Sequence, residues 1–239
     1  MNTLFIDKEG KKHFKNITPE TEELQTQFGI IRIKDINKDA GKAKTHKDYE
    51  FRVYEASLQE KVENMKMGSR PIYPYDSGVM CAMINIKPGS KVLEAGSGSG
   101  GNTMYMAEMG AIIDTYEREQ RFQEIAEKNL SEYKNVKSHL GSVIEAKLKE
   151  EYYDTLFFDL QEPDAAIEKC DYALKHGGFV GVFTPIMDDI KPVWRKFEER
   201  GYMDIRAIQL DLKELIVKKY ARVKGLMGFP GFFIWARKP

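Results

Sequence analysis

A run of closely spaced glycines stands directly after an apolar segment that reads as a strand. Gly96, Gly98 and Gly101 fit the spacing GxGxxG, and Gly100 offers the variant GxGxG. Glycines at this spacing let the backbone turn tightly and approach a ligand closely at the carboxyl end of a first strand. Taken alone, the spacing is compatible with a dinucleotide or with S-adenosylmethionine.

Two carboxylates near the glycines favour S-adenosylmethionine. Glu94 stands two residues before the first glycine, where it can pair with an amino-acid ammonium group, which a dinucleotide lacks. Glu117 follows Gly96 by 21 residues at the end of a second strand pattern, a position suited to ribose hydroxyls of either cofactor. The remaining chain is too short for the further units of a Rossmann oxidoreductase.

Asp159 ends a fourth strand pattern, after Thr155 and the apolar residues 156–158. In a doubly wound sheet this strand end lies beside the end of the first strand, where ligands bind. Because an unpaired buried carboxylate is costly, we expect Asp159 in the ligand site. The alternative is that Asp159 caps a helix that starts near Asp164.

The elements that would position these residues alternate between helix and strand from about Tyr75 onward. Strands are expected over 91–95, 111–117, 136–140, 155–160, 179–183, 203–210 and 232–236. Helices are expected over 76–83, 102–109, 121–130, 164–174 and 192–199. This order predicts an α/β fold with a doubly wound, mostly parallel sheet of seven strands and an antiparallel edge.

The first quarter of the chain has a different pattern. Residues 28–33 and 51–54 alternate apolar and polar side chains, and residues 7–12 look like a hairpin tip. Gly68, Pro71 and Pro74 interrupt any regular element over 66–74. We therefore expect a small N-terminal β module over residues 1–66 and a Rossmann-like domain over 67–239.

Composition narrows the class of protein. With 239 residues, 31% charged and 42% hydrophobic, the chain is ordinary for a globular protein. No apolar run approaches the roughly 18 residues of a membrane span. Residues 1–15 carry charges throughout, so we do not expect secretion by a signal peptide. Cys81 and Cys170 are the two cysteines and stand far apart, which excludes a disulfide framework and a CxxC-type zinc site. We expect a cytoplasmic protein without a metal.

Charge is unevenly distributed, although the formal net charge is zero. Residues 71–190 carry a net charge of −9 and residues 191–239 a net charge of +7. A basic C-terminal segment can contact the phosphates of a nucleic acid. We favour RNA contact for Lys218, Lys219, Arg222 and Lys224, and a buried strand over a base-stacking surface for residues 229–233.

Together these motifs resemble the tRNA (adenine-N1) methyltransferase family that acts at position 58 of the T-loop, or at 57 and 58 in archaea. The resemblance rests on Tyr73-Pro74-Tyr75-Asp76, residues 92–101, Tyr116-Glu117 and residues 159–163, and it extends to an N-terminal module over 29–67. It implies an S-adenosylmethionine-dependent enzyme, commonly a homotetramer, that methylates N1 of an adenine in tRNA.

The resemblance also implies roles for single residues. Asp159 and Tyr73 match catalytic positions, and Glu94, Gly96, Gly98 and Glu117 match cofactor-binding positions. Ser142 stands where many methyltransferases place an Asp against the adenine of the cofactor. The cofactor site is therefore predicted to comprise Glu94, Gly96, Ser97, Gly98, Ser99, Gly100, Glu117, Ser142 and Asp159.

Three departures from the family pattern lie on the nucleobase side. The usual Lys is Tyr75, the usual Trp after Glu-Pro is Asp164, and the usual His-Thr before a small residue is Phe229-Pro230. The exact nucleotide therefore stays open. Two alternatives also stay open: methylation of another acceptor such as protein isoaspartate, and a non-catalytic tRNA-binding paralogue.

Overall fold

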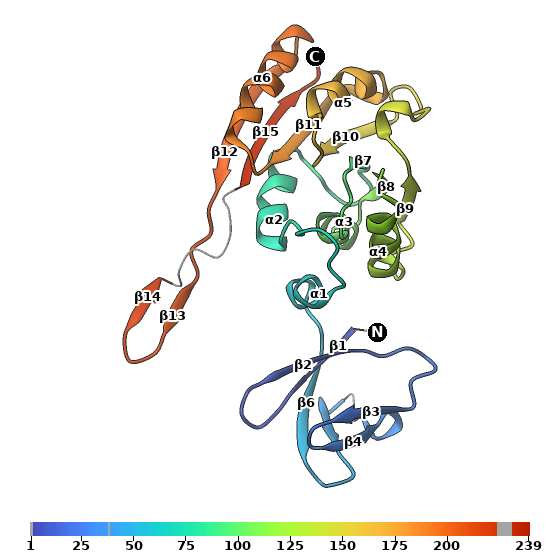
Figure 1. Cartoon of the computed structure of the whole chain (residues 1–239), viewed down its shortest axis with the longest axis vertical. Coiled ribbons are helices and arrows are strands. Elements are labelled where there is room, and N and C mark those ends of the chain that lie inside the picture. Colours follow the sequence, from blue (N-terminus) through green and yellow to red (C-terminus); the bar gives the residue numbers. More distant parts are fainter. Residues whose placement is uncertain (1, 38, 224–230) are drawn as a thin grey trace. The chain divides into compact units, whose positions relative to one another are not determined.

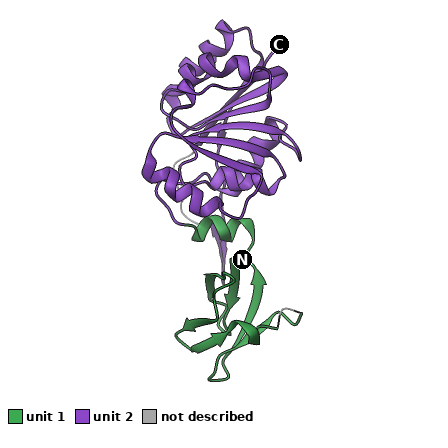
Figure 2. Cartoon of the chain, turned by 90° about the vertical axis from the view of Figure 1, so that its right-hand side faces the viewer, with its two compact units in different colours: residues 1–65 green, residues 66–239 purple. Residues whose placement is uncertain are grey.

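The computed structural model describes residues 2–37, 39–223 and 231–239. The chain divides into two compact units, Met1–Met65 and Lys66–Pro239, shown in different colours in Figure 2. This division lies one residue from the one expected between residues 66 and 67.

The first unit is built from antiparallel strands. A four-stranded sheet has the order β2-β1-β6-β5, and β3 and β4 form a separate hairpin. Its core contains Phe5, Ile31 and Phe51. The strands are β1 (Asn2–Ile6), β2 (Lys12–Asn16), β3 (Glu23–Thr26), β4 (Gly29–Arg32), β5 (Lys42–Lys44) and β6 (Glu50–Glu55), with a 3₁₀ turn η1 (Ile33–Asp35).

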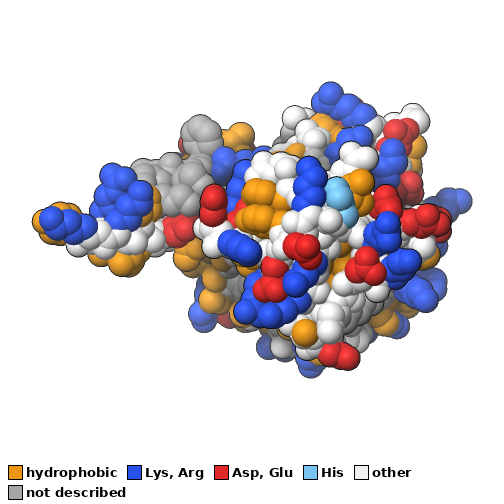
Figure 3. Space-filling view, turned by 90° about the horizontal axis from the view of Figure 1, so that it is seen from below, with side chains coloured by type: hydrophobic (Ala, Val, Ile, Leu, Met, Phe, Trp, Pro, Cys, Tyr) orange, Lys and Arg blue, Asp and Glu red, His pale blue; other side chains and the backbone are white. Residues whose placement is uncertain are grey.

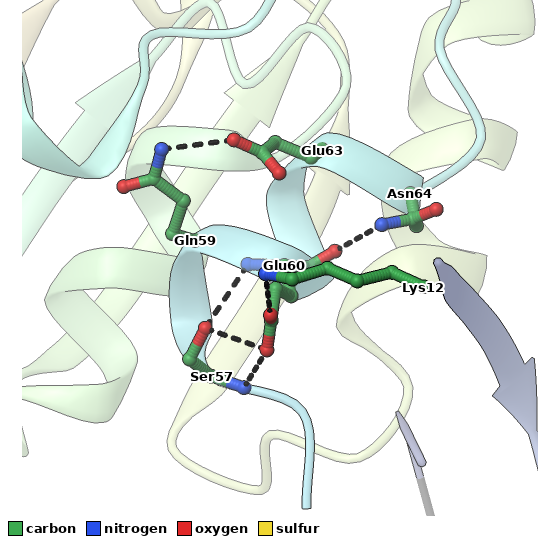
Figure 4. Close-up of polar contacts among 6 residues, drawn as sticks. All are labelled: Lys12, Ser57, Gln59, Glu60, Glu63 and Asn64. Carbon is green, nitrogen blue, oxygen red and sulfur yellow. Dashed lines mark hydrogen bonds and ion pairs between the residues drawn. The ribbon is translucent and has the colours of Figure 1, made fainter. Parts of the chain in front are cut away.

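A short helix, α1 (Leu58–Asn64), ends this unit where only short β pieces were expected. Its first turn is a capping box: the Glu60 amide donates to Ser57 Oγ (3.3 Å), and the Ser57 amide donates to Glu60 Oε2 (3.0 Å). The Lys12 ammonium also donates to Glu60 Oε1 at 2.5 Å, which ties the helix to β2 (Figure 4). The Ser-x-x-Glu pattern is a local signal for this helix start, and the expectation of β pieces overlooked it.

The second unit contains the predicted seven-stranded sheet, with the order β12-β15-β11-β10-β7-β8-β9 (Figure 1). β7 to β11 are parallel, and β15 runs antiparallel to both β11 and β12. This is the expected doubly wound sheet with an antiparallel edge. The strands are β7 (Lys91–Ala95), β8 (Ile112–Glu117), β9 (Val136–Leu140), β10 (Tyr153–Phe158), β11 (Leu174–Thr184), β12 (Met203–Leu210) and β15 (Gly231–Arg237).

Helices cover the sheet, and its middle strand β10 is buried from Thr155 to Phe158. The helices are α2 (Pro74–Met83), α3 (Gly101–Glu108), α4 (Gln120–Leu130), α5 (Pro163–Cys170) and α6 (Ile190–Glu199). The expected helix over 164–174 was wrong at its end: α5 stops at Cys170, a 3₁₀ turn η3 (Asp171–Ala173) follows, and Leu174 already pairs with Tyr153. Burial of Leu174 against the sheet overrides the local helical pattern.

A hairpin that the sequence pattern did not indicate stands between β12 and β15. It consists of β13 (Leu215–Val217) and β14 (Ala221–Val223), and it forms the projection at the left of Figure 3, where basic and apolar side chains mix. Lys218, Lys219 and Arg222 belong to it, whereas Lys224 and Phe229-Pro230 lie outside the described residues. Phe232 and Phe233 are buried in β15, which confirms the expected buried strand for the described part of residues 229–233. Among the described residues, no helix is long and apolar enough to cross a membrane.

Candidate active site

The glycine loop connects β7 to α3 at the carboxyl edge of the parallel strands. Gly96, Gly98 and Gly100 all have positive φ (88°, 53° and 88°), which side chains rarely adopt. The Gly96 amide donates to the carbonyl oxygen of Tyr116 (2.9 Å), so the loop is held against the end of β8.

A cavity of about 550 Å³ opens at this edge, a size typical of small-molecule sites. Its walls come from the glycine loop, the segment before α2, and the loops after β8, β9 and β10. Of the nine residues predicted for the cofactor, five line it: Gly96, Gly98, Glu117, Ser142 and Asp159.

Glu117 lies at the end of β8 and braces the loop opposite. Its Oε2 accepts a hydrogen bond from the Gly98 amide, and its Oε1 accepts one from the Glu119 amide, both at 3.0 Å. The residue is 8% exposed. Its carboxylate is therefore held at the cavity wall with remaining lone pairs available for hydroxyl groups.

Asp159 lies at the switch point beside the first strand, as the sequence predicted. Its amide donates to the carbonyl oxygen of Ala95 (2.9 Å), which joins the ends of β7 and β10. Its carboxylate lines the cavity and has no hydrogen-bond partner among the described residues. The residue before α5 is Glu162, so Asp159 is not the cap of that helix.

Burial raises the pKa of the Asp159 carboxyl to about 7, and the negative charges of Glu94 and Glu117 add to this rise. A cation bound in the cavity would relieve this repulsion and favour the charged carboxylate.

Glu94 has a different position from the one expected for a ligand of an ammonium group. It is 2% exposed and does not line the cavity. Its carboxylate accepts hydrogen bonds from Asn102 Nδ2 (3.0 Å) and from the hydroxyls of Thr103 (2.5 Å) and Thr115 (2.7 Å). Burial raises the pKa of Glu94, while these three donors oppose the rise. The side chain thus ties α3 and β8 to the end of β7.

Ser99 also lies behind the cavity, where it holds the segment 66–70, here called the strap. Its hydroxyl donates to the Ser69 carbonyl oxygen (2.7 Å) and accepts from the amides of Gly68 (2.9 Å) and Ser69 (3.1 Å). Asn129 from α4 adds a second fastening, because its Nδ2 donates to the carbonyl oxygens of Lys66 and Ser99, both at 2.8 Å. These bonds place Ser69 and Arg70 of the strap on the cavity wall.

The other predicted residues lie close to this framework. Gly100 precedes α3, and Ser97 has a buried hydroxyl with no hydrogen-bond partner among the described residues. Tyr73 precedes α2 and does not line the cavity; its ring lies parallel to that of Tyr75, with 5.6 Å between centroids.

Several wall residues were not found from the sequence. Arg70 and Ser69 fall in the stretch that was treated only as a break between units. Arg118 and Gln161 join the loops after β8 and β10 through a hydrogen bond of 2.8 Å between Arg118 Nη2 and Gln161 Oε1. The one local signal is their place one residue after Glu117 and two residues after Asp159, because residues after strand ends share the same edge of the sheet.

The chain is similar in sequence to proteins named as tRNA methyltransferases. The sequence profile of the "tRNA methyltransferase complex GCD14 subunit" family matches residues 64–227. The tRNA (adenine(58)-N(1))-methyltransferase TrmI of Thermus thermophilus is 34% identical over 185 residues, which are 74% of this chain and 72% of the relative. The tRNA (adenine(57)-N(1)/adenine(58)-N(1))-methyltransferase TrmI of Methanocaldococcus jannaschii is 28% identical over 99% of this chain and 94% of its own length.

Solved structures share the fold over the whole chain. The tRNA (m1A58) methyltransferase TrmI from Aquifex aeolicus superposes with a TM-score of 0.80 at 22% identity, covering 100% of this chain and 97% of that chain. A SAM-dependent O-methyltransferase from Thermotoga maritima gives a TM-score of 0.83 at 23% identity, covering 99% and 92%. At such identities the likeness shows the methyltransferase fold alone. The profile match spans more than half of the sequence, and the chain therefore belongs to the GCD14 family of tRNA methyltransferase subunits.

Proposed function

We propose that this protein is a tRNA methyltransferase that transfers a methyl group from S-adenosylmethionine to N1 of an adenine in the T-loop. The observation that carries this proposal is Asp159, a carboxylate without a partner among the described residues, at the strand end that faces the glycine loop. Membership of the family and the names of the matched relatives support the acceptor.

The residues at the cavity fit S-adenosylmethionine. Gly96 and Gly98 present backbone without a side chain to the cavity. Glu117 offers its carboxylate to ribose hydroxyls, and Ser142 lies on the wall where the adenine of the cofactor would rest. When bound, the cofactor supplies an electrophilic methyl group on a positively charged sulfur. Glu94 then acts indirectly by tying α3 and β8 to the end of β7. The Asp159 carboxylate would balance positive charge in the cavity.

Asp159 would position the adenine that accepts the methyl group. Its carboxylate can accept a hydrogen bond from the exocyclic amine, which raises the electron density at N1 and orients the N1 lone pair. After transfer the methylated base is cationic, and the same carboxylate balances that charge. Tyr73 would help to hold the base once it has left its stack in the tRNA.

The hairpin β13–β14 supports assembly of several copies. Leu215, Val217 and Tyr220 are 59%, 74% and 76% exposed, and apolar side chains that are exposed together mark interaction surfaces. We propose a homotetramer in which this hairpin is covered by another copy, and light scattering of the purified protein reports the number of copies.

We propose that the enzyme works in the cytoplasm. Cys81 and Cys170 are both buried free thiols, which suits a reducing compartment.

The decisive experiment is incubation with labelled S-adenosylmethionine and unmodified tRNA, followed by mapping of the modified nucleoside. We expect 1-methyladenosine in the T-loop, and the map also distinguishes positions 57 and 58. Methylation of a guanine, or of protein alone, contradicts the proposed acceptor. A flat calorimetric titration with S-adenosylmethionine would instead support the non-catalytic paralogue.

The pH dependence of the reaction follows from Asp159. Its pKa is raised to about 7, so its carboxyl is neutral below that pH and charged above it. If the charged form accepts the amine hydrogen bond, kcat/KM rises roughly tenfold between pH 6 and pH 8 and then levels. The variant Asp159→Asn cannot titrate and serves as control. A wild-type profile that is flat over this range, or one that the Asn variant reproduces, contradicts the assignment.

Loss of the Ser99 hydroxyl is expected to weaken cofactor binding. Ser99→Ala removes the hydroxyl that donates to the Ser69 carbonyl oxygen and accepts from the Gly68 amide. These backbone groups of the strap then lack a partner, which costs about 1–3 kcal/mol of stability. Because Ser69 and Arg70 line the cavity, the Kd for S-adenosylmethionine should rise by about fivefold or more, while kcat at saturation changes little. Ser131→Ala, which removes an exposed hydroxyl at the end of α4, is the matched control. Equal Kd values for the two variants would show that the strap does not act on the cofactor.

A further inference from the structure

One face of the β8–β9 edge of the sheet is left open. β9 is the last strand of the sheet, and between Gly141 and Tyr152, all of them described, the helical segment is only the 3₁₀ turn η2 (Val143–Glu145). Side chains alternate along each strand, and the parallel register places Lys137 and His139 of β9 beside Asp114 and Tyr116 of β8. These side chains therefore share the open face.

Four lysines converge on a cavity of about 410 Å³ on this face, here called the lysine hollow. They come from three places: the loop before β9, β9 itself, and the loop before β10, and they are Lys134, Lys137, Lys147 and Lys149. Residues 71–190 hold only 11 Lys and Arg against 20 Asp and Glu. Four of those 11 basic residues line one cavity, so the clustering runs against the charge of the segment.

The lysines are not neutralised by neighbouring carboxylates. Lys134, Lys137 and Lys147 form no ion pair with any residue that the structure describes. The ammonium group of Lys149 lies 4.7 Å from the centroid of the Tyr152 ring, and that of Lys91 lies 4.1 Å from the same centroid. A positive group over an aromatic face keeps its charge, so these contacts leave the hollow basic.

Asp114 is the carboxylate that lines the hollow, and both of its oxygens already accept hydrogen bonds. Oδ1 accepts from His139 Nε2 and Oδ2 from the hydroxyl of Tyr153, each at 3.0 Å. Four lysines against one carboxylate leave a formal charge of +3 in the hollow. A polyanion is the chemical class that such a cavity binds.

The hollow adjoins the proposed active site. Tyr116 lines both cavities, and its ring stacks on that of His139 with 4.5 Å between centroids. A tRNA that places one base in the active site extends far beyond it, and its nearby backbone carries a phosphate at every nucleotide. We propose that the lysine hollow binds backbone phosphates of the bound tRNA. This inference rests on the proposed function.

The test removes two lysines from the full-length protein. In Lys137→Ala/Lys147→Ala both altered residues are exposed, so the fold is preserved. We expect the KM for tRNA to rise roughly tenfold and the slope of log K against log salt to fall by about 1.5, since each phosphate contact contributes about 0.7 to 0.9. The Kd for S-adenosylmethionine and kcat at saturating tRNA should not change.

The matched control is Lys128→Ala/Lys169→Ala, which removes the same charge from exposed positions on α4 and α5. If both double variants bind tRNA alike and with the same salt slope, the proposal is overturned, although the enzyme still methylates tRNA. Inorganic tripolyphosphate probes the other source of phosphate. If the hollow variant loses tripolyphosphate binding but not tRNA affinity, the hollow is a small-anion site and the RNA assignment fails.

A wild type that methylates no tRNA contradicts the proposed function itself. In that case, direct measurement of tRNA binding by the same variants still tests whether the lysine hollow binds tRNA.

Discussion

Asp159→Ala is expected to lower kcat by roughly 100-fold or more while the Kd for S-adenosylmethionine stays within a few-fold of the wild type. The size of the loss is that of one preorganised polar contact in a site shielded from water. The Asp159 carboxylate has no hydrogen-bond partner among the described residues, so its removal breaks no bond that holds the fold. Single-turnover rates on tRNA and calorimetric titration of the cofactor measure the two quantities separately.

Asp159→Asn separates the two roles of this side chain. Its amide oxygen still accepts a hydrogen bond from the adenine amine, but it carries no charge to balance the cationic product. We expect a rate between those of the wild type and of Asp159→Ala. Near-normal turnover by Asp159→Ala on tRNA would show that Asp159 is only a loop residue and that the proposed chemistry is wrong.

Gly96→Ala is expected to abolish detectable cofactor binding. A Cβ at Gly96 would lie 1.8 Å from the carbonyl oxygen of Asp159, which is backbone and cannot turn aside. The ends of β7 and β10 must therefore separate, and that motion displaces both the glycine loop and Asp159. We expect the Kd to rise at least 100-fold, a cost of about 3 kcal/mol.

Gly89→Ala is the matched control for this variant. Gly89 has φ +83°, close to the +88° of Gly96, but a Cβ there would meet no atom within 4 Å. Both variants carry the strain of a left-handed alanine, about 1–2 kcal/mol, whereas only Gly96→Ala adds the collision. Thermal unfolding measures the loss of stability that both variants share. Titration with S-adenosylmethionine measures the difference in cofactor affinity between them. Equal cofactor affinity in the two variants would contradict the close approach of the two strands.

The regular part of the fold and the edge that carries the site could be predicted from the sequence. Lys91–Ala95 and Val136–Leu140 were expected at the bounds that the structure has. Short segments of strand-forming residues that end at glycines are local signals in the sequence. The places of Gly96, Glu117 and Asp159 followed from a general rule: parallel strands end at one edge, and residues just after them meet there.

Local sequence patterns predicted the elements less well where burial or strand pairing decides the structure. The helix expected to reach residue 174 stops at Cys170 because Leu174 joins the sheet, and the hairpin β13–β14 gave no recognisable signal. A short strand pair that packs on no described core has no apolar alternation to reveal it.

The sequence was enough to predict that Gly96, Glu117 and Asp159 lie at the ligand edge of the sheet. What the neighbouring side chains contact there depends on the tertiary structure. Glu94 was expected to meet an ammonium group, but three donors from α3 and β8 occupy its carboxylate. Ser99 was expected at the cofactor and instead holds the strap, 30 residues away in the chain. Such contacts join residues that are distant in sequence. The direction of a side chain depends on the partners that fold around it, so the spacing of residues along the chain does not encode these contacts.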